Sequence, residues 1–439
     1  MTAIPMHPGP APRPLNREDY KTLGLSALGG TLEFYDFVIF VFFTVTISHL
    51  FFPPGMPEWM SQLQTLGIFA AGYLARPVGG IVIAHFGDRL GRKKMFALSV
   101  FLMSLPTFVI GILPTYASIG IAAPLLLLLM RMLQGAAIGG EMPGAWVFVA
   151  EHVPRGRYGF GIGVLTAGIT GGILLGSFMA IFINRAYSPE EVSDFAWRIP
   201  FLLGGVFGFI SVYLRRFLDE TPVFRELREQ RQIADELPVR TVLREHRTAC
   251  LMTAGLTWTL STTVVVLILM TPTLLQKIHG IAASSALEAN SVGTFALSVG
   301  CVLFGWLFDR IGARATAWIG LGGLAVAAGW FYTGLPGIGR EALMLRYAVI
   351  GLFCGAIVLT PILAVRAFPP AIRFSGLSFS YNLAYALFGG LTPVLTQLWL
   401  QRDVLAPAYY VAATALLGIL LAAHPLAVHG RRGAAARPG

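Results

Sequence analysis

Twelve long apolar stretches recur along this chain of 439 residues and constrain its fold more than any other feature. A helix needs about 20 apolar residues to cross a hydrocarbon core of roughly 30 Å. We expect membrane spans at 22–47, 62–86, 95–113, 122–150, 159–184, 198–217, 249–275, 290–308, 315–334, 344–367, 374–398 and 406–427. Only 12% of the residues are charged, about half the share typical of soluble proteins. The sequence therefore predicts an all-α membrane protein.

The basic residues predict the orientation of these spans, because loops rich in Lys and Arg stay in the cytoplasm. Of the 32 Lys and Arg, 24 fall in loops and tails on one side and six on the other. Both termini are therefore expected to be cytoplasmic. The net charge of +10 follows from this topology and predicts contact with anionic lipid, not with nucleic acid.

One long polar segment, residues 218–248, divides the spans six and six. We expect a cytoplasmic tail at 1–21, a six-helix bundle at 22–217, a cytoplasmic loop at 218–248, a second bundle at 249–427 and a tail at 428–439. The first apolar stretch is followed by no cleavage site and is expected to be a retained helix. The three cysteines are isolated within predicted helices, so neither a disulfide nor a metal site is expected.

The two halves share a trace of duplication. Residues 87–94 (GDRLGRKK) follow the second span, and residues 308–314 (FDRIGAR) follow the eighth, which is the second span of the second half. Parallel six-helix repeats around a central substrate site are a known transporter architecture.

The loop motif and its echo resemble the signature of the major facilitator superfamily. Further stretches resemble its metabolite:proton symporter family, whose members carry citrate, 2-oxoglutarate, shikimate, and proline or betaine: 32–37 (LEFYDF), 76–80 (RPVGG), 131–135 (RMLQG), 139–141 (GGE), 197–201 (WRIPF) and 388–393 (FGGLTP). The chain departs from the pattern at Ala84, where the superfamily has Gly, although Gly305 keeps it in the second copy. Ala313 also replaces the Arg that would match Arg92, so the second copy is expected to be weaker.

The resemblance implies a secondary transporter in the bacterial inner membrane, working as a monomer on a small-molecule substrate with protons. A proton-driven exporter of the same fold stays open as an alternative, and a nutrient sensor is disfavoured by the short tails. Motifs of hydrolases, metalloproteases and P-loop ATPases are absent from the sequence, so an enzyme is not expected, and no cofactor is expected either.

Charged residues at membrane depth are functional candidates, because each costs about 2.5–3.5 kcal/mol to insert. Asp36, Glu33 and Arg131 lie near the midplane in the first and fourth spans. In related sugar:proton symporters an acid and an Arg at the matching positions couple proton binding to transport. We therefore expect Asp36 and Arg131 to form a proton-coupling pair. A static salt bridge and Glu33 as the proton carrier are the alternatives.

Other polar residues complete the predicted site. Arg76 and Glu141 are expected to form a structural or gating pair across neighbouring helices, with substrate contact as the alternative. Arg131 is the only cation placed near the midplane, which favours a substrate with one or two carboxylates or a zwitterion. The candidate substrate contacts are Arg131, Tyr35, Gln134, Tyr381, Asn382 and Tyr385, although helix packing is the commoner role for each of these side chains.

The loop motifs are expected to form a gate. Asp88 should accept hydrogen bonds from the N-terminus of a neighbouring helix and from Arg92, closing the cytoplasmic face. Glu151 and Arg155 match the acidic and basic partners of related carriers. The expected gate residues are Asp88, Arg89, Arg92, Glu151, Arg155, Asp309 and Arg310.

Overall fold

The structure is a computed structural model that describes residues 11–230 and 238–424. Among these residues, twelve helices are long and apolar enough to cross a membrane, which confirms the predicted fold class. The first six spans are α1 (Arg17–Phe42), α3 (Glu58–Leu90), α4 (Arg92–Ile112), α6 (Ala122–His152), α7 (Tyr158–Ala186) and α9 (Arg198–Arg215). Short helices between them are α2 (Thr44–Phe51), α5 (Tyr116–Ile119), η1 (Arg155–Arg157), α8 (Pro189–Glu191) and η2 (Val192–Ala196).

The second half has three uninterrupted spans, α14 (Ala283–Ile311), α15 (Ala313–Thr333) and α20 (Ala406–Ala423). Its other three spans each change helix type midway. α12 (Arg247–Thr263) continues through the π-helical η3 (Val264–Met270) into α13 (Thr271–His279), and α16 (Arg340–Cys354) continues through η4 (Gly355–Val358) into α17 (Leu359–Arg366). After η5 (Pro370–Ile372), α18 (Arg373–Ala384) continues through the π-helical η6 (Tyr385–Gly389) into α19 (Gly390–Leu400). Such π-helical turns often mark functional sites.

The first span begins five residues before its expected start, because the polar residues ahead of it cap the helix. Asn16 accepts a hydrogen bond from the backbone N–H of Asp19, and Asp19 accepts one from that of Asn16. This reciprocal pair satisfies helix-end donors that would otherwise be unpaired. The polar segment between the halves contains two amphipathic helices, α10 (Pro222–Glu229) and α11 (Pro238–Glu245). Residues 1–10 and 428–439 of the predicted tails lie outside the described residues.

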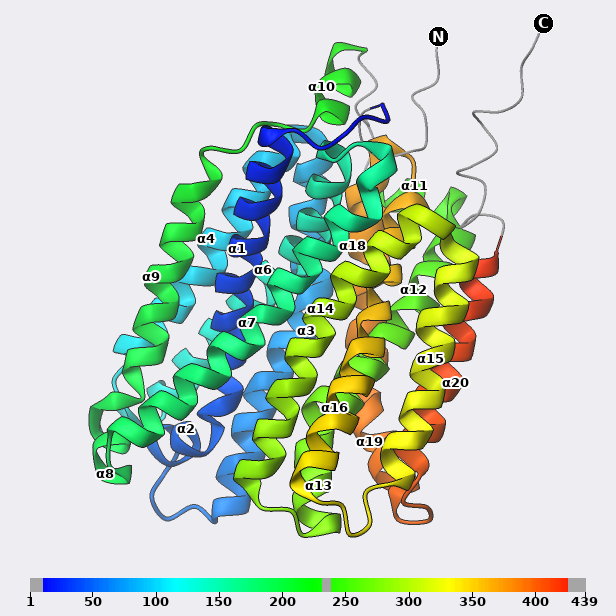
Figure 1. Cartoon of the computed structure of the whole chain (residues 1–439). Helices are drawn as coiled ribbons and strands as arrows, with labels where there is room; N and C mark the ends of the chain where they lie inside the picture. Colours follow the sequence, from blue (N-terminus) through cyan, green and yellow to red (C-terminus); the bar gives the residue numbers. More distant parts are fainter. Residues whose placement is uncertain (1–10, 231–237, 425–439) are drawn as a thin grey trace, which may run out of the picture.

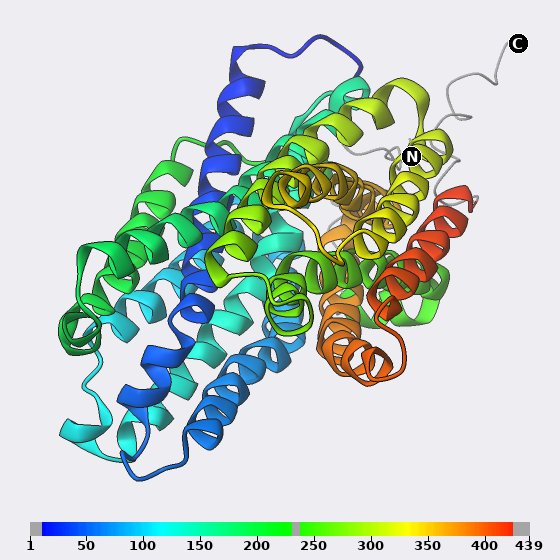
Figure 2. The ribbon, with the colours of Figure 1, turned by 60° about the horizontal axis from the view of Figure 1, so that its bottom comes forward.

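α1 begins and α20 ends at the same end of the molecule, where α10 and α11 also lie (Figure 1). This end is the one that the charge pattern predicts to be cytoplasmic, and we name it the predicted cytoplasmic end. The two halves lie side by side (Figure 2), with α7 packed against α14 and α3 packed against α18.

The halves approach closely where glycines face each other across this interface. A Cβ atom on Gly305 of α14 would lie 2.3 Å from the carbonyl oxygen of Gly159 on α7. In the α3–α18 contact the close approaches are made instead at Gly80 and at Gly87, where a Cβ would lie 2.3 Å from the Phe374 ring. Ala84 is therefore tolerated at the position that matches Gly305.

Candidate functional site

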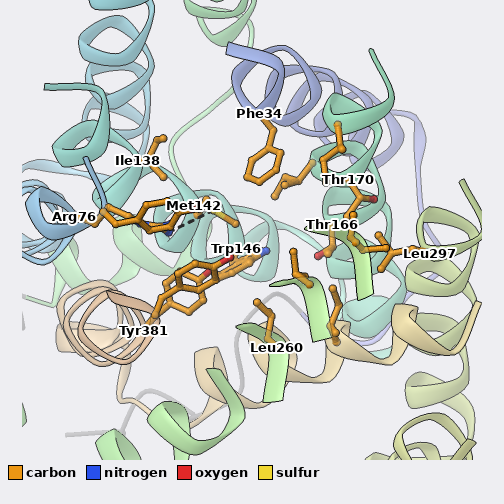
Figure 3. A pocket seen from close by; sticks show the side chains of 17 residues that line it. Phe34, Arg76, Ile138, Met142, Trp146, Thr166, Thr170, Leu260, Leu297 and Tyr381 are labelled. Atoms are coloured by element: carbon orange, nitrogen blue, oxygen red, sulfur yellow. Dashed lines mark hydrogen bonds between the residues drawn. The ribbon is translucent and has the colours of Figure 1, made fainter. Parts of the chain in front are cut away.

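A cavity lies between the two halves, lined by side chains from both bundles (Figure 3). Its first-half walls come from α1, α3, α6 and α7. The second half contributes residues of α12, η3, α14, η4, α18 and η6, so two π-helical turns reach the cavity. The lining is apolar apart from one cation, two threonines and several amphipathic aromatic side chains: Arg76, Thr166, Thr170, Tyr73, Trp146, Tyr381 and Tyr385.

Arg76 is the charged residue of this cavity. Its guanidinium carbon lies 4.7 Å from the ring centroid of Tyr385, 5.5 Å from that of Tyr73 and 5.8 Å from that of Tyr381. The side chain is 3% exposed. Nε donates to Asn382 Oδ1 at 3.3 Å, and Nη2 contacts Met142 Sδ at 3.8 Å. Within the described part of the chain, no carboxylate forms an ion pair with Arg76.

The predicted pair of Arg76 with Glu141 is therefore wrong. Glu141 Oε1 instead accepts a hydrogen bond from Arg215 Nη2 of α9 at 3.3 Å. Successive helical residues are about 100° apart around the axis, and the next residue, Met142, is the one that faces Arg76. Arg76 lies near the middle of α3, which runs to Leu90, 14 residues or about 21 Å beyond it, so, contrary to expectation, Arg131 is not the only cation near mid-span.

The predicted substrate contacts divide into two groups. Tyr381 and Tyr385 line the cavity, and Asn382 bonds the cation within it. Tyr35, Gln134 and Arg131 are not among the lining residues. Tyr35 instead donates to the carbonyl of Pro200 at 3.0 Å.

Sequence reasoning missed Trp146, Tyr73 and Phe34 as lining residues. Trp146 meets the Tyr381 ring edge to face at a centroid distance of 5.0 Å, and its Nε1 has no hydrogen-bond partner within the described structure. An indole five residues beyond the GGE stretch on the same span was the available signal.

A second polar cluster lies outside the cavity lining and involves α1, α4, α6 and α9. Arg131 Nη1 donates to Gln134 Oε1 at 2.8 Å, and Gln134 Nε2 donates to Thr107 Oγ1 at 2.6 Å. Asp36 is fully buried beside Thr107, and a Cβ on Gly204 would lie 2.4 Å from its Oδ1. Gly204 thus leaves the space that the carboxyl group occupies.

The expected direct pair of Asp36 with Arg131 is not formed in this structure. Arg131 bonds Gln134, and Gln134 bonds Thr107, which neighbours Asp36; the guanidinium carbon of Arg131 lies 4.2 Å from the ring centroid of Phe40. Spacing placed both residues at similar depth, but it did not reveal that Arg131 bonds Gln134, one turn away on its own helix. The side chain of Glu33 lies outside the described residues.

Buried charges join the halves at the predicted cytoplasmic end. Asp88 Oδ2 accepts from the backbone N–H of Ser375, near the N-terminus of α18, at 2.8 Å, and its Oδ1 pairs with Arg92 at 3.1 Å. These are the contacts expected for Asp88. Arg92 also donates to the carbonyl of Pro370 at 2.8 Å.

Glu151 extends this network across the interface. Its carboxylate accepts from Arg373 Nη1 at 2.8 Å and from Thr221 Oγ1 at 2.7 Å, and it lies 3.5 Å from Arg92 Nε. Arg373, which sequence reasoning did not select, is fully buried and belongs to the second half. The network of Asp88, Arg92, Glu151 and Arg373 therefore joins the two halves at one end of the interface; we name it the inner lock.

The second motif copy repeats part of this arrangement. Asp309 accepts from the backbone N–H groups of Gly159 and Phe160, at the N-terminus of α7, at 2.7 and 2.8 Å. With Ala313 in place of an arginine, the counterpart of the Asp88–Arg92 pair is missing. Arg89 and Arg310 are exposed and Arg155 is half-buried; Arg310 packs against the Trp306 ring at 4.9 Å.

Comparison with known proteins agrees with this architecture. The profile of the Major Facilitator Superfamily matches residues 37–393. The chain is 32% identical to the proline/betaine transporter of Salmonella typhimurium, over 91% of this chain and 82% of the relative. It is also 32% identical, with the same coverage, to the glycine betaine/proline/ectoine/pipecolic acid transporter OusA of Dickeya dadantii.

A solved structure of the proton:xylose symporter XylE superposes with a TM-score of 0.77 at 16% identity, covering 92% of this chain and 95% of that one. At this identity the likeness concerns the fold. The helices, the half–half cavity and the sequence relatives lead to one assignment. The chain is a multi-pass membrane transporter, not an enzyme, and it belongs to the Major Facilitator Superfamily.

Proposed function

We propose that this protein is a proton-coupled symporter of a small zwitterion with one carboxylate, of the betaine or proline type. The observation that carries the proposal is Arg76, a buried cation in the half–half cavity that faces aromatic rings and pairs with no carboxylate within the described residues. A desolvated guanidinium is best satisfied by an anion that it holds through two parallel hydrogen bonds. The substrate carboxylate is that anion.

The aromatic lining supports a cationic group at the other end of the substrate. Quaternary ammonium groups bind the faces of Trp, Tyr and Phe rings. Phe34 and Trp146 line the same cavity as Arg76 (Figure 3). One cation does not offset the desolvation of a tricarboxylate, so citrate is disfavoured. The names of the relatives, which mention betaine and proline, favour the zwitterion over a dicarboxylate.

Asp36 is the proposed proton carrier. It is fully buried, and an ionisable group at membrane depth is a functional site by default. Thr107 has one hydroxyl proton, which it donates to the carbonyl of Met103 at 3.0 Å while accepting from Gln134. The carboxylate of an ionised Asp36 competes with the Met103 carbonyl for the Thr107 hydroxyl proton, whereas a protonated Asp36 does not. The charge state of Asp36 therefore alters the contacts of Gln134 and, through it, of Arg131.

The deciding experiment is uptake into proteoliposomes with imposed gradients. We expect betaine or proline to accumulate when the outside is acidic and accumulation to collapse with a protonophore. Accumulation under the opposite gradient would identify an exporter, and uptake indifferent to both proton and voltage gradients would reject coupling. We place the protein in the inner membrane with both termini in the cytoplasm; protease or labelling access to each terminus in oriented vesicles tests this placement.

A further inference from the structure

A proline in α6 leaves one carbonyl group without its usual helical partner. In an α-helix the carbonyl of residue 139 accepts from the N–H of residue 143, but Pro143 has no N–H. A buried carbonyl without a partner is costly in a membrane, so such groups are satisfied by neighbouring helices. Gly139 therefore presents a free acceptor on the first half of the transporter.

The partners of this acceptor come from the second half. Asn382 Nδ2 of α18 donates to the Gly139 carbonyl at 2.6 Å, and Ser378 Oγ, one turn earlier, donates to it at 3.1 Å. Gly80 of α3 makes room for both: a Cβ there would lie 2.6 Å from Asn382 Nδ2 and 2.7 Å from Ser378 Oγ. We name the contact of Asn382 and Ser378 with Gly139 the carbonyl latch.

The same amide group also binds the cavity cation. Asn382 Oδ1 accepts from Arg76 Nε at 3.3 Å while Nδ2 holds Gly139. We propose that Asn382 is a positioning residue. It couples the binding of a carboxylate to Arg76 with the separation of α18 from the first half. The proposal rests on the proposed function, because it takes a substrate carboxylate as the ligand of Arg76.

The coupling follows from the strengths of the two acceptors. A carboxylate accepts from a guanidinium roughly twice as strongly as a neutral amide oxygen does, so a bound substrate displaces Asn382 Oδ1. Asn382 then holds the first half through Gly139 alone. Its helix, α18, also provides the Ser375 N–H that binds Asp88, seven residues or about 10 Å away. Weakening the latch therefore loosens the helix that closes the inner lock.

The test measures the opening of this interface directly. Ser375 is fully buried against α3, so a Ser375→Cys probe, in a background with the three native cysteines replaced, reports separation by its alkylation rate with N-ethylmaleimide. Asn382→Ala removes the amide. Pro143→Ala keeps the amide but supplies a helical N–H that competes for Gly139. Ser380→Ala is the matched control, because Ser380 is buried on α18, donates to the carbonyl of Gly376 of its own helix and neighbours Cys250 of the same half.

Without substrate, we expect Asn382→Ala to raise probe alkylation about tenfold and Pro143→Ala to raise it by a smaller factor, with Ser380→Ala unchanged. Saturating betaine should raise alkylation in the parent but not further in Asn382→Ala. Parental alkylation in both Asn382→Ala and Pro143→Ala overturns the latch, whatever the substrate is. A full betaine response in Asn382→Ala overturns the coupling. If betaine does not change probe alkylation in the parent but Asn382→Ala is still alkylated faster, the result supports the latch and contradicts the proposed substrate.

Discussion

The guanidinium of Arg76 lies 4.7 Å from the ring of Tyr385, and the two residues belong to different halves of the transporter. This contact puts a buried cation at the place where the halves must move apart and together. A substrate bound there touches both bundles at once. A substrate shifts the equilibrium between two conformations only by the difference between its affinities for them.

Replacing Arg76 tests the substrate carboxylate. Arg76→Gln removes the charge, and we expect betaine affinity to fall on the order of 30-fold or more, because losing one partner of a buried charge pair costs about 2–5 kcal/mol. Arg76→Lys keeps the charge but not the planar fork, so its loss should be smaller. The measurement is the Kd for betaine by calorimetry on purified protein. Arg340→Gln, in an exposed ion pair with Glu288, is the control; equal affinities in Arg76→Gln and this control would exclude Arg76 from the site.

Trp146 tests the cationic end of the substrate. We expect Trp146→Leu to weaken betaine binding by about two- to 30-fold, the range of cation–π energies from exposed to desolvated sites, and Trp146→Phe to weaken it less. The isostere 3,3-dimethylbutyrate has the same shape and carboxylate, with an uncharged tert-butyl group in place of the quaternary ammonium. Competition assays with both ligands separate charge from volume. If Trp146→Leu weakens both ligands equally, the ring acts by packing alone.

Asp36 tests proton coupling. Asp36→Asn mimics the protonated acid permanently, so we expect gradient-driven accumulation to be lost while counterflow exchange of substrate continues. Thr107→Val keeps Asp36 but breaks its link to Gln134, and should shift the pH dependence of uptake without abolishing it. The measurements are accumulation and counterflow in proteoliposomes across external pH. Normal accumulation by Asp36→Asn would move the proton site elsewhere, with Glu33→Gln as the next variant.

The parts of the site that depend on local chemistry could be predicted from the sequence. Asp88 could be placed at a helix N-terminus with Arg92, because a carboxylate beside unpaired N–H groups follows from one motif. The partner of Arg76 could not be predicted, because spacing along one helix does not show that Glu141 pairs with Arg215 of α9. The bridge of Gln134 and Thr107 between Asp36 and Arg131, and the contact of Asn382 with Gly139, require the packing of separate helices. Spacing along one helix does not contain that information.

The two motif copies differ in a way that predicts unequal gating. Asp88 accepts from a backbone N–H and pairs with a buried arginine, whereas Asp309 accepts from two backbone N–H groups and has Ala313 where the arginine would be. Hydrogen bonds between charged groups contribute more than those with one neutral partner. Asp88→Asn should therefore shift the population toward states open at the predicted cytoplasmic end by about tenfold, and Asp309→Asn by less.

Measuring the uptake rate and the betaine Kd distinguishes a gating role of Asp88 from a role in substrate binding. Asp88→Asn leaves Arg76 and its aromatic neighbours untouched, so the betaine Kd should stay close to the parental value while the maximal uptake rate falls, because the lock must re-form in each cycle. Alkylation of the Ser375→Cys probe gives the population and initial uptake gives the rate. A purely structural loss lowers the yield of folded protein but leaves the open fraction of the folded molecules unchanged. Equal probe accessibility in Asp88→Asn and the parent would therefore show that the buried carboxylate stabilises the fold without holding the interface shut.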